Sequence, residues 1–139
     1  MSPASQPAQR RGAVAVINND GKLLVIRRSQ TVAAPGKFCF PGGGIEEGES
    51  EEDTVRRELM EELNLCVNPL QQLWTSTTPW GVWLAWWHSE VEDLNDLRLN
   101  PAEVESVHWL TPEEMLELPE LLESNREFIH SGVLQKLLG

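Results

Sequence analysis

Residues 43–65 read GGIEEGESEEDTVRRELMEELNL, a glycine-led loop that runs into a segment with helix-forming composition. Residues three and four positions apart share one face of a helix, so Glu58, Glu61 and Glu62 should project toward one volume. Three like charges in one volume are costly unless a cation lies among them. Oxygen-only ligands suit a hard ion such as Mg²⁺ or Mn²⁺. The stretch therefore predicts a helix that carries a divalent-metal site.

The same helix has an anchoring side and a defined start. Arg57 can donate two parallel hydrogen bonds to a carboxylate and hold that side chain in one rotamer, a role that its planar guanidinium fills better than a lysine ammonium would. Ser50, three residues before Asp53, is typical of a capping box and places the helix start at Ser50. The apolar side consists of residues spaced by four: Val55, Leu59 and Leu63.

The spacing of these residues resembles the Nudix box, with matches at Gly43, Glu49, the run Arg57-Glu58-Leu59, Glu61-Glu62 and Leu65. The family has glycine where this chain has Asn64. A residue just past a helix end often adopts a left-handed conformation, and asparagine tolerates it next best after glycine. The resemblance implies an α/β fold, the α/β/α sandwich with a mixed β-sheet between helices.

The resemblance also implies hydrolysis of a nucleoside diphosphate linked to another group. Glu58, Glu61 and Glu62 would hold the metal, and the backbone carbonyl of Gly43 could complete its shell. Glu61 or Glu58 could accept a proton from the attacking water, with Arg57 completing the catalytic set. Some relatives use a glutamate outside the box, and two residues could fill that role or be ordinary exposed glutamates: Glu103 and Glu105.

The substrate is less well defined by sequence. Arg27-Arg28 followed by Phe40-Pro41-Gly42-Gly43 resembles the layout of mutator-type Nudix proteins that act on nucleotides. Consecutive strand residues face opposite sides, so only one of the two arginines can reach a pocket. We expect Arg28 to contact phosphate, and a purine nucleoside di- or triphosphate is the leading substrate.

Tryptophans are concentrated at residues 80–87, whereas the chain has no tyrosine. On a strand, Trp83 and Trp87 would share one face and Trp86 would lie on the other. We expect Trp83, Trp87 and Phe40 to offer aromatic faces to a base. Core packing is the alternative role for each of them.

Other substrates and other classes of protein stay open. The segment from Gly36 to Gly43 partly resembles the upstream motif of coenzyme A pyrophosphatases, but the arginine expected within it is absent. Dinucleotide and nucleotide-sugar pyrophosphatases are further alternatives, as is a Nudix-fold domain that senses ligands without turnover. Because the box carboxylates are all present, the enzyme is favoured over the sensor.

Alternating periodicities predict the order of elements. Residues 12–17 and 22–28 should form a hairpin around the turn at 18–21, and a loop should run through 34–40. Further strands are expected at 70–75, 81–91 and 105–110. Thr111-Pro112 should start a helix, and residues 121–138 should form the last one, with Gly132 as a weak point.

Length and charge limit the partners. The 139 residues predict one domain, residues 11–139, after a flexible tail at residues 1–10. A net charge of −11 argues against polymeric nucleic acid or an anionic membrane as partner, although a metal-bound nucleotide remains compatible. Two cysteines form no disulfide framework, and no secretory or spanning segment is visible, so a cytoplasmic protein is expected. A small nucleotide-type substrate is the expected partner, and a homodimer is left open.

Overall fold

The computed structural model describes residues 10–138. One of its two β-sheets is mixed and has four strands. Its strand order is β5-β1-β7-β6. The strand β1 (Arg10–Val16) runs parallel to β7 (Val82–Val91) and antiparallel to the edge strand β5 (Gly42–Gly44). The other edge strand, β6 (Val67–Thr77), pairs antiparallel with β7.

A second sheet is antiparallel throughout and is centred on β3 (Lys22–Arg28). This strand pairs with β2 (Asn18–Asn19), β4 (Phe38–Cys39) and β8 (Val104–Leu110). The β3–β8 pairing shifts register between Arg27 and Arg28. The second sheet therefore brings residues after position 100 beside the arginines of β3.

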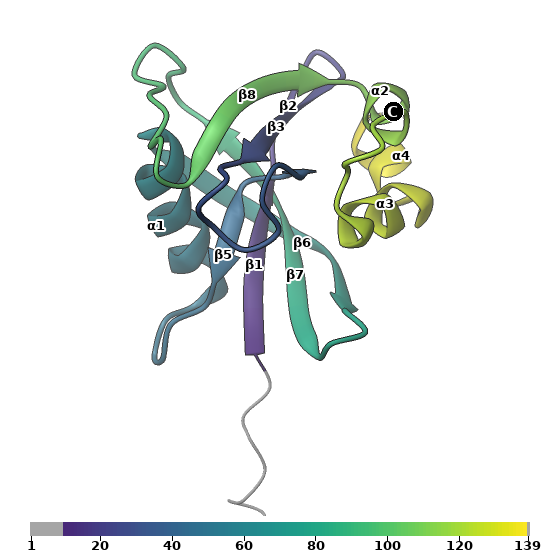
Figure 1. Cartoon of the computed structure of the whole chain (residues 1–139), viewed down its shortest axis with the longest axis horizontal. Helices are drawn as coiled ribbons and strands as arrows, with labels where there is room; N and C mark the ends of the chain where they lie inside the picture. The colour runs from purple at the N-terminus through teal and green to yellow at the C-terminus, as the bar shows by residue number, and fades with distance from the viewer. Residues whose placement is uncertain (1–9, 139) are drawn as a thin grey trace, which may run out of the picture.

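Helices cover the strands on two sides (Figure 1). The helix α1 (Glu51–Leu63) lies on one side, and α2 (Pro112–Leu116), α3 (Glu123–His130) and α4 (Val133–Leu138) lie on the other. The expected α/β/α sandwich with a mixed sheet is confirmed. Within residues 10–138 no helix is long and apolar enough to cross a membrane.

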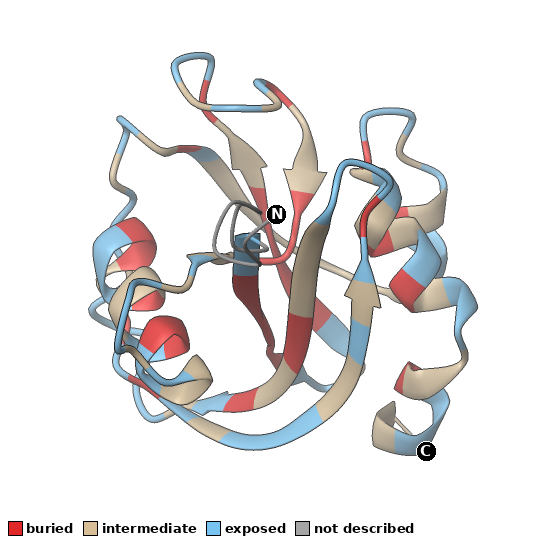
Figure 2. Ribbon diagram, turned by 90° about the horizontal axis from the view of Figure 1, so that it is seen from below, coloured by how far each residue is buried: buried red, intermediate tan, exposed pale blue. Residues whose placement is uncertain are grey.

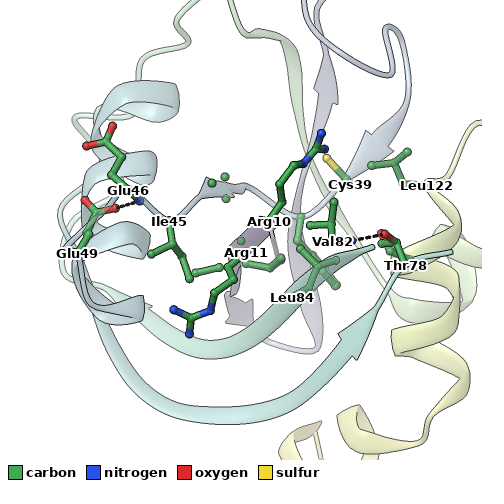
Figure 3. Close-up of a pocket in the computed structure, with 18 of the residues that line it drawn as sticks. Arg10, Arg11, Cys39, Ile45, Glu46, Glu49, Thr78, Val82, Leu84 and Leu122 are labelled. Atoms are coloured by element: carbon green, nitrogen blue, oxygen red, sulfur yellow. Dashed lines mark hydrogen bonds between the residues drawn. The ribbon is translucent and has the colours of Figure 1, made fainter. Parts of the chain in front are cut away.

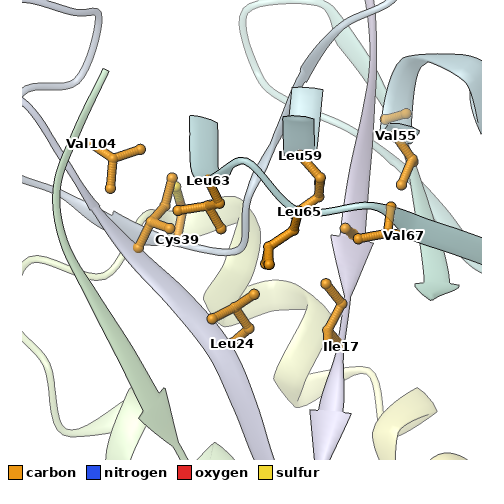
Figure 4. Packing of buried hydrophobic residues seen from close by; sticks show 12 residues of the cluster. Ile17, Leu24, Cys39, Val55, Leu59, Leu63, Leu65, Val67 and Val104 are labelled. Carbon is orange, nitrogen blue, oxygen red and sulfur yellow. The ribbon is translucent and has the colours of Figure 1, made fainter. Parts of the chain in front are cut away.

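Alternation along the strands builds two cores. On β1, Ala13 and Ala15 face a cluster that contains Leu59 of α1, while Val14 and Val16 face a cluster around Phe128 of α3. Figure 4 shows the first cluster, in which the stripe of α1 meets residues from the strands. Figure 2 shows buried segments turned inward and exposed ones at the surface. All three residues of the predicted apolar stripe are fully buried: Val55, Leu59 and Leu63.

Three sequence expectations are corrected. The strand β1 pairs with β5 and β7, so the hairpin partner of β3 is only the short strand β2. The expected loop at 34–40 ends in β4. The last helix breaks into α3 and α4 because Gly132 adopts φ +84°, a left-handed conformation that cannot continue a right-handed helix. Of the tail expected at residues 1–10, Arg10 begins β1 and residues 1–9 lie outside the described residues.

The ends of α1 follow the local sequence. Ser50 is the N-cap, and its side chain accepts a hydrogen bond from the Asp53 backbone N–H. Asn64 ends the helix at φ 56° and ψ 36°, the left-handed conformation expected there. Its side-chain amide also donates to the Asp96 carbonyl at 2.9 Å. Asparagine therefore fills the glycine position at little cost.

We predict that substitutions of Asn64 rank by backbone conformation. Asn64→Ala should unfold at lower urea concentration than Asn64→Gly, with a free energy of unfolding about 1 kcal/mol lower, because alanine is strained at positive φ. Both variants lose the bond to Asp96, so their comparison isolates the backbone. Equal stability of the two variants would contradict this account of the helix end.

Candidate active site

The glycine strand β5 lies directly against carboxylates of α1. A Cβ atom on Gly43 would collide with the carboxyl group of Glu58. The backbone N–H of Gly42 donates to Oε1 of Glu62 at 3.0 Å. Because β5 has no side chains, Glu58 and Glu62 can approach its backbone closely. Gly43 is thus required by the position of Glu58, whereas a Cβ atom on Gly42 would collide with the backbone of β1 at Ala13 and Val14.

Arg57 fixes the glutamates around it. Its Nε donates to Oε2 of Glu49 at 2.8 Å and its Nη2 to Oε1 of Glu49 at 2.9 Å, the expected forked pair. Nη1 donates to Glu58 at 2.9 Å and to Glu61 at 3.4 Å. The bonds from Arg57 and from the Thr54 hydroxyl lower the pKa of Glu49 to about 2. Glu49 and Arg57 therefore form a charged brace beside the metal-ligand candidates.

Two carboxylates are held where their charge is costly. Burial raises the pKa of Glu62 to about 9, and the neighbouring carboxylates of Glu58 and Glu103 act in the same direction. Burial also raises the pKa of Glu58 to about 7, although Arg57 opposes this. Without an added cation, these groups retain protons that ordinary glutamates lose.

Glu103 adds a third buried oxygen. Its Oε2 atom is buried and has no hydrogen-bond partner among the described residues. Its charge also raises the pKa of both Glu58 and Glu62, which places it beside them. A buried acceptor without a donor is uncommon, and a cation would satisfy it.

The donor set fits a hard divalent ion, although the side chains do not surround a common point. Within residues 10–138 no group of three or more histidine, cysteine, aspartate or glutamate side chains is arranged so that it could hold a metal ion as it stands. Arg57 and the Gly42 amide instead occupy oxygens of Glu58, Glu61 and Glu62. Every available donor is nevertheless oxygen, the ligand that Mg²⁺ and Mn²⁺ prefer.

The structure separates the remaining polar candidates. Arg28 lies close enough to Glu62 to lower its pKa, and its Nε donates to the Ala33 carbonyl at 2.6 Å. Arg27 instead pairs with Glu105 at 3.2 Å, on the exposed side of β3 and β8. Glu103 is therefore brought to the carboxylates of α1, whereas Glu105 is engaged by Arg27. Glu61 is the most exposed of the three box glutamates, with 47% of its side chain accessible.

A cavity of about 960 Å³ is lined in part by the glycine strand β5. Its walls come from the start of β1, the glycine strand, the loop at 45–49, the turn before β7 and the start of α3. Figure 3 shows Val82, Leu84 and Leu122 on one side and Glu46 and Glu49 on the other. The volume is at the upper end of the usual range for small-molecule sites.

The aromatic expectations are partly corrected. Trp83 and Trp87 share a face as predicted, but neither is among the described residues that line the cavity. The guanidinium carbon of Arg11 lies 4.8 Å from the centroid of the Trp83 ring. Trp87 Nε1 donates a hydrogen bond to Glu51 of α1 at 2.8 Å, because this face of β7 is turned toward α1. Phe40 lines the back of the cavity, although it is itself buried against Trp86 and Phe128.

Sequence reasoning missed several residues of the cavity wall, including Trp80, Arg10 and Asn125. Trp80 is 67% exposed at the rim. Arg10 lines the cavity from β1. Side chains alternate between the two faces of a strand, so the sequence could have placed Arg10 on the same face as Gly12 and Val14. Asn125 lines the α3 side, and its Oδ1 accepts from the Phe40 backbone N–H at 2.9 Å. No local pattern in the sequence marks Asn125.

Comparison with known proteins gives one consistent family. The sequence model described as NUDIX domain matches residues 7–131. A Nudix hydrolase of Deinococcus radiodurans is 33% identical over 129 residues, which cover 81% of this chain and 71% of that protein. The nucleoside triphosphatase NudI of Escherichia coli O139:H28 is 38% identical over 73 residues, 52% of this chain and 48% of NudI. The crystal structure of a MutT protein from Methanosarcina mazei Go1 superposes with a TM-score of 0.78 at 22% identity, over 94% of this chain and 96% of that one, which shows the shared fold.

We predict that the metal-free protein loses stability as pH rises. The folded state keeps a proton on Glu62 up to about pH 9, whereas the unfolded chain releases it near the ordinary glutamate pKa. The stabilisation is thus complete at low pH and is lost as pH rises through this interval. Urea unfolding in chelator should show a free energy of unfolding at pH 8.5 that is lower than at pH 5.5 by more than about 1 kcal/mol.

Glu62→Gln is the matched control for this measurement, since its side-chain oxygen can still accept from Gly42 without titrating. The loss of stability between the two pH values should be smaller in this variant. Parallel stability curves for the two proteins would show that Glu62 is ionised in the folded state and would refute this electrostatic description.

Proposed function

The chain belongs to the Nudix hydrolase family, and on that premise we propose that it hydrolyses the pyrophosphate linkage of a nucleotide with the help of Mg²⁺ or Mn²⁺. It is a pyrophosphohydrolase by class, as its family membership shows. A nucleoside di- or triphosphate or a related nucleotide derivative is the proposed substrate. Coenzyme A, dinucleotides and nucleotide sugars are the alternatives within the same chemistry.

One observation carries this proposal. Glu58 and Glu62 lie against a strand without side chains, and a buried oxygen of Glu103 without a partner lies beside them. Three carboxylates in a partly buried volume repel one another unless a cation joins them. A surface helix that served only for solubility would have no reason to bury them.

The proposed metal ligands are Glu58, Glu61 and Glu62, with the carbonyl of Gly43 and an oxygen of Glu103 as further donors. When bound, the ion would offset negative charge on the phosphates and make a water molecule more acidic. Arg57 keeps Glu58 oriented through its bonds to Glu49 and to the Gly44 carbonyl. Loss of Arg57 should therefore misplace a ligand as well as remove a charge.

The residue that accepts the proton must have a carboxylate oxygen that is not already held by a hydrogen bond or a metal ion. Glu62 is held by Gly42, and Glu58 by Arg57. Glu61 makes one bond at 3.4 Å to Arg57 and is exposed to solvent. We therefore place Glu61 first as the base that takes the proton of the attacking water, with Glu58 and Glu103 as alternatives.

The nucleotide would extend from the carboxylates into the cavity. Arg28, beside Glu62, is in position to contact the phosphates. Val82 and Leu84 offer an apolar floor to a base, and Trp80 can cover it from the rim. The cavity thus supports an aromatic contact at Trp80 in place of the one expected at Trp83 and Trp87.

Removal of one ligand charge should abolish turnover without unfolding the protein. Glu62→Gln should lower kcat by about 100-fold or more with Mg²⁺, because it keeps the shape but weakens metal binding. Product release from a panel of nucleoside triphosphates, nucleotide sugars, dinucleotides and coenzyme A measures this. Circular dichroism should show an unchanged fold.

Glu90→Gln is the control, since it removes the same charge from an exposed residue of β7. Its turnover should equal that of the unmodified chain. Full activity of Glu62→Gln on the best substrate of the panel would refute the assignment of α1 as the metal site.

A further inference from the structure

Arg10 places a positive charge on the wall of the cavity, which the glutamate side chains proposed as metal ligands do not line. It is the first residue of β1 and lines the cavity on the same strand face as Gly12 and Val14. Neither the box glutamates Glu58, Glu61 and Glu62 nor Arg28 lines this cavity. The glycine strand β5 borders both regions, since its residues line the cavity and its backbone lies against Glu58. The charge of Arg10 is therefore distinct from the groups that would handle the scissile diphosphate.

The neighbouring charges leave Arg10 available to a ligand. Arg11 also lines the cavity, but its guanidinium points away from that of Arg10 (Figure 3), pairs with Glu51 at 3.5 Å and covers Trp83. Glu49, on the cavity wall, is held by Arg57 at 2.8 Å. Within residues 10–138 no carboxylate oxygen lies within 4.0 Å of the Arg10 guanidinium. In a chain with a net charge of −11, such an arginine is well placed to bind an anion.

Two other polar side chains of the cavity accept hydrogen bonds from the protein backbone. Oδ1 of Asn125 accepts from the Phe40 backbone, and Oγ1 of Thr78 accepts from the Val82 backbone at 3.0 Å. The planar guanidinium of Arg10 remains charged at every working pH and offers a fork of donors that matches phosphate oxygens. The cavity is also larger than most small-molecule sites, so it has room for a substituent beyond one nucleoside.

We propose that Arg10 determines specificity by binding a second phosphate, a phosphomonoester on the substrate that is separate from the diphosphate being cleaved. The substrate class is then a phosphorylated nucleotide derivative, such as a dinucleotide or a nucleotide conjugate with an additional phosphate on a ribose. This inference rests on the proposed function, because it assumes that the diphosphate lies at the carboxylates of α1. In this arrangement the diphosphate is cleaved at the carboxylates of α1, and Arg10 determines which nucleotide binds there in preference to others.

Pairs of substrates that differ by one phosphate test the inference. NADPH is compared with NADH, and coenzyme A with dephospho-coenzyme A, each with saturating Mn²⁺. The unmodified chain should show a kcat/KM higher by about 10- to 100-fold for the phosphorylated member of at least one pair, as expected for a charge-assisted contact. In Arg10→Met this ratio should fall to about one, mainly through KM of the phosphorylated member. Arg10→Lys keeps the charge without the fork and should retain part of the ratio.

Arg98→Met is the control, because Arg98 is an exposed arginine that does not line the cavity, and it should keep the full ratio. Hydrolysis of both members of each pair at equal kcat/KM would overturn the inference and leave the proposed function standing. Equal losses on both members in Arg10→Met would also overturn it, since Arg10 would then act on the shared diphosphate. Failure to hydrolyse any diphosphate in the panel would remove the proposed function, and the inference with it.

Discussion

The burial of carboxylates against a bare backbone is the constraint on which the site depends. Glu58 can reach β5 only because Gly43 has no side chain, and Glu62 accepts a hydrogen bond from the Gly42 backbone beside it. This proximity removes water that would stabilise the two charges. The raised pKa values of about 7 and 9 are the measure of that cost. A divalent cation is the simplest compensation, since it satisfies the carboxylates and the unpartnered oxygen of Glu103 together. The fold thus stores an unfavourable arrangement that becomes favourable when metal and substrate bind.

The strand β5 borders both the carboxylates of α1 and the cavity, the two regions proposed for cleavage and for recognition. On one side of this strand lie the carboxylates of α1, which are held in place by the brace of Arg57 and Glu49. The cavity also borders β5, and its lining continues through residues of β1 and β7. A substrate that passes the glycine strand can therefore contact both regions. In the proposed arrangement, changes in the cavity residues would alter which nucleotide binds without any change in α1.

The sequence predicted what local rules determine and missed what depends on distant contacts. The bounds of α1, its cap at Ser50 and the left-handed Asn64 follow from short-range geometry and were confirmed. The pairing of β1 with β7 joins residues about 70 positions apart, and no local pattern indicates it. The same limit explains the tryptophans: the period of two showed that Trp83 and Trp87 share a face, but only the packing of α1 decides which face meets the cavity. Likewise, Glu103 and Glu105 lie two positions apart, so the sequence alone could not distinguish them as candidates for the base. In the structure Arg27 pairs with Glu105 and not with Glu103.

The central claim is that a divalent ion replaces protons at Glu58 and Glu62. Calorimetric titration of the protein with Mn²⁺ near pH 7, in buffers of different ionisation enthalpy, measures the protons released per ion bound. Because Glu62 is protonated and Glu58 partly protonated at this pH, the account predicts release of about one proton or more, most of it absent in Glu62→Gln. Binding of Mn²⁺ without proton release would contradict the claim, since the carboxylates would then be ionised before the metal arrives.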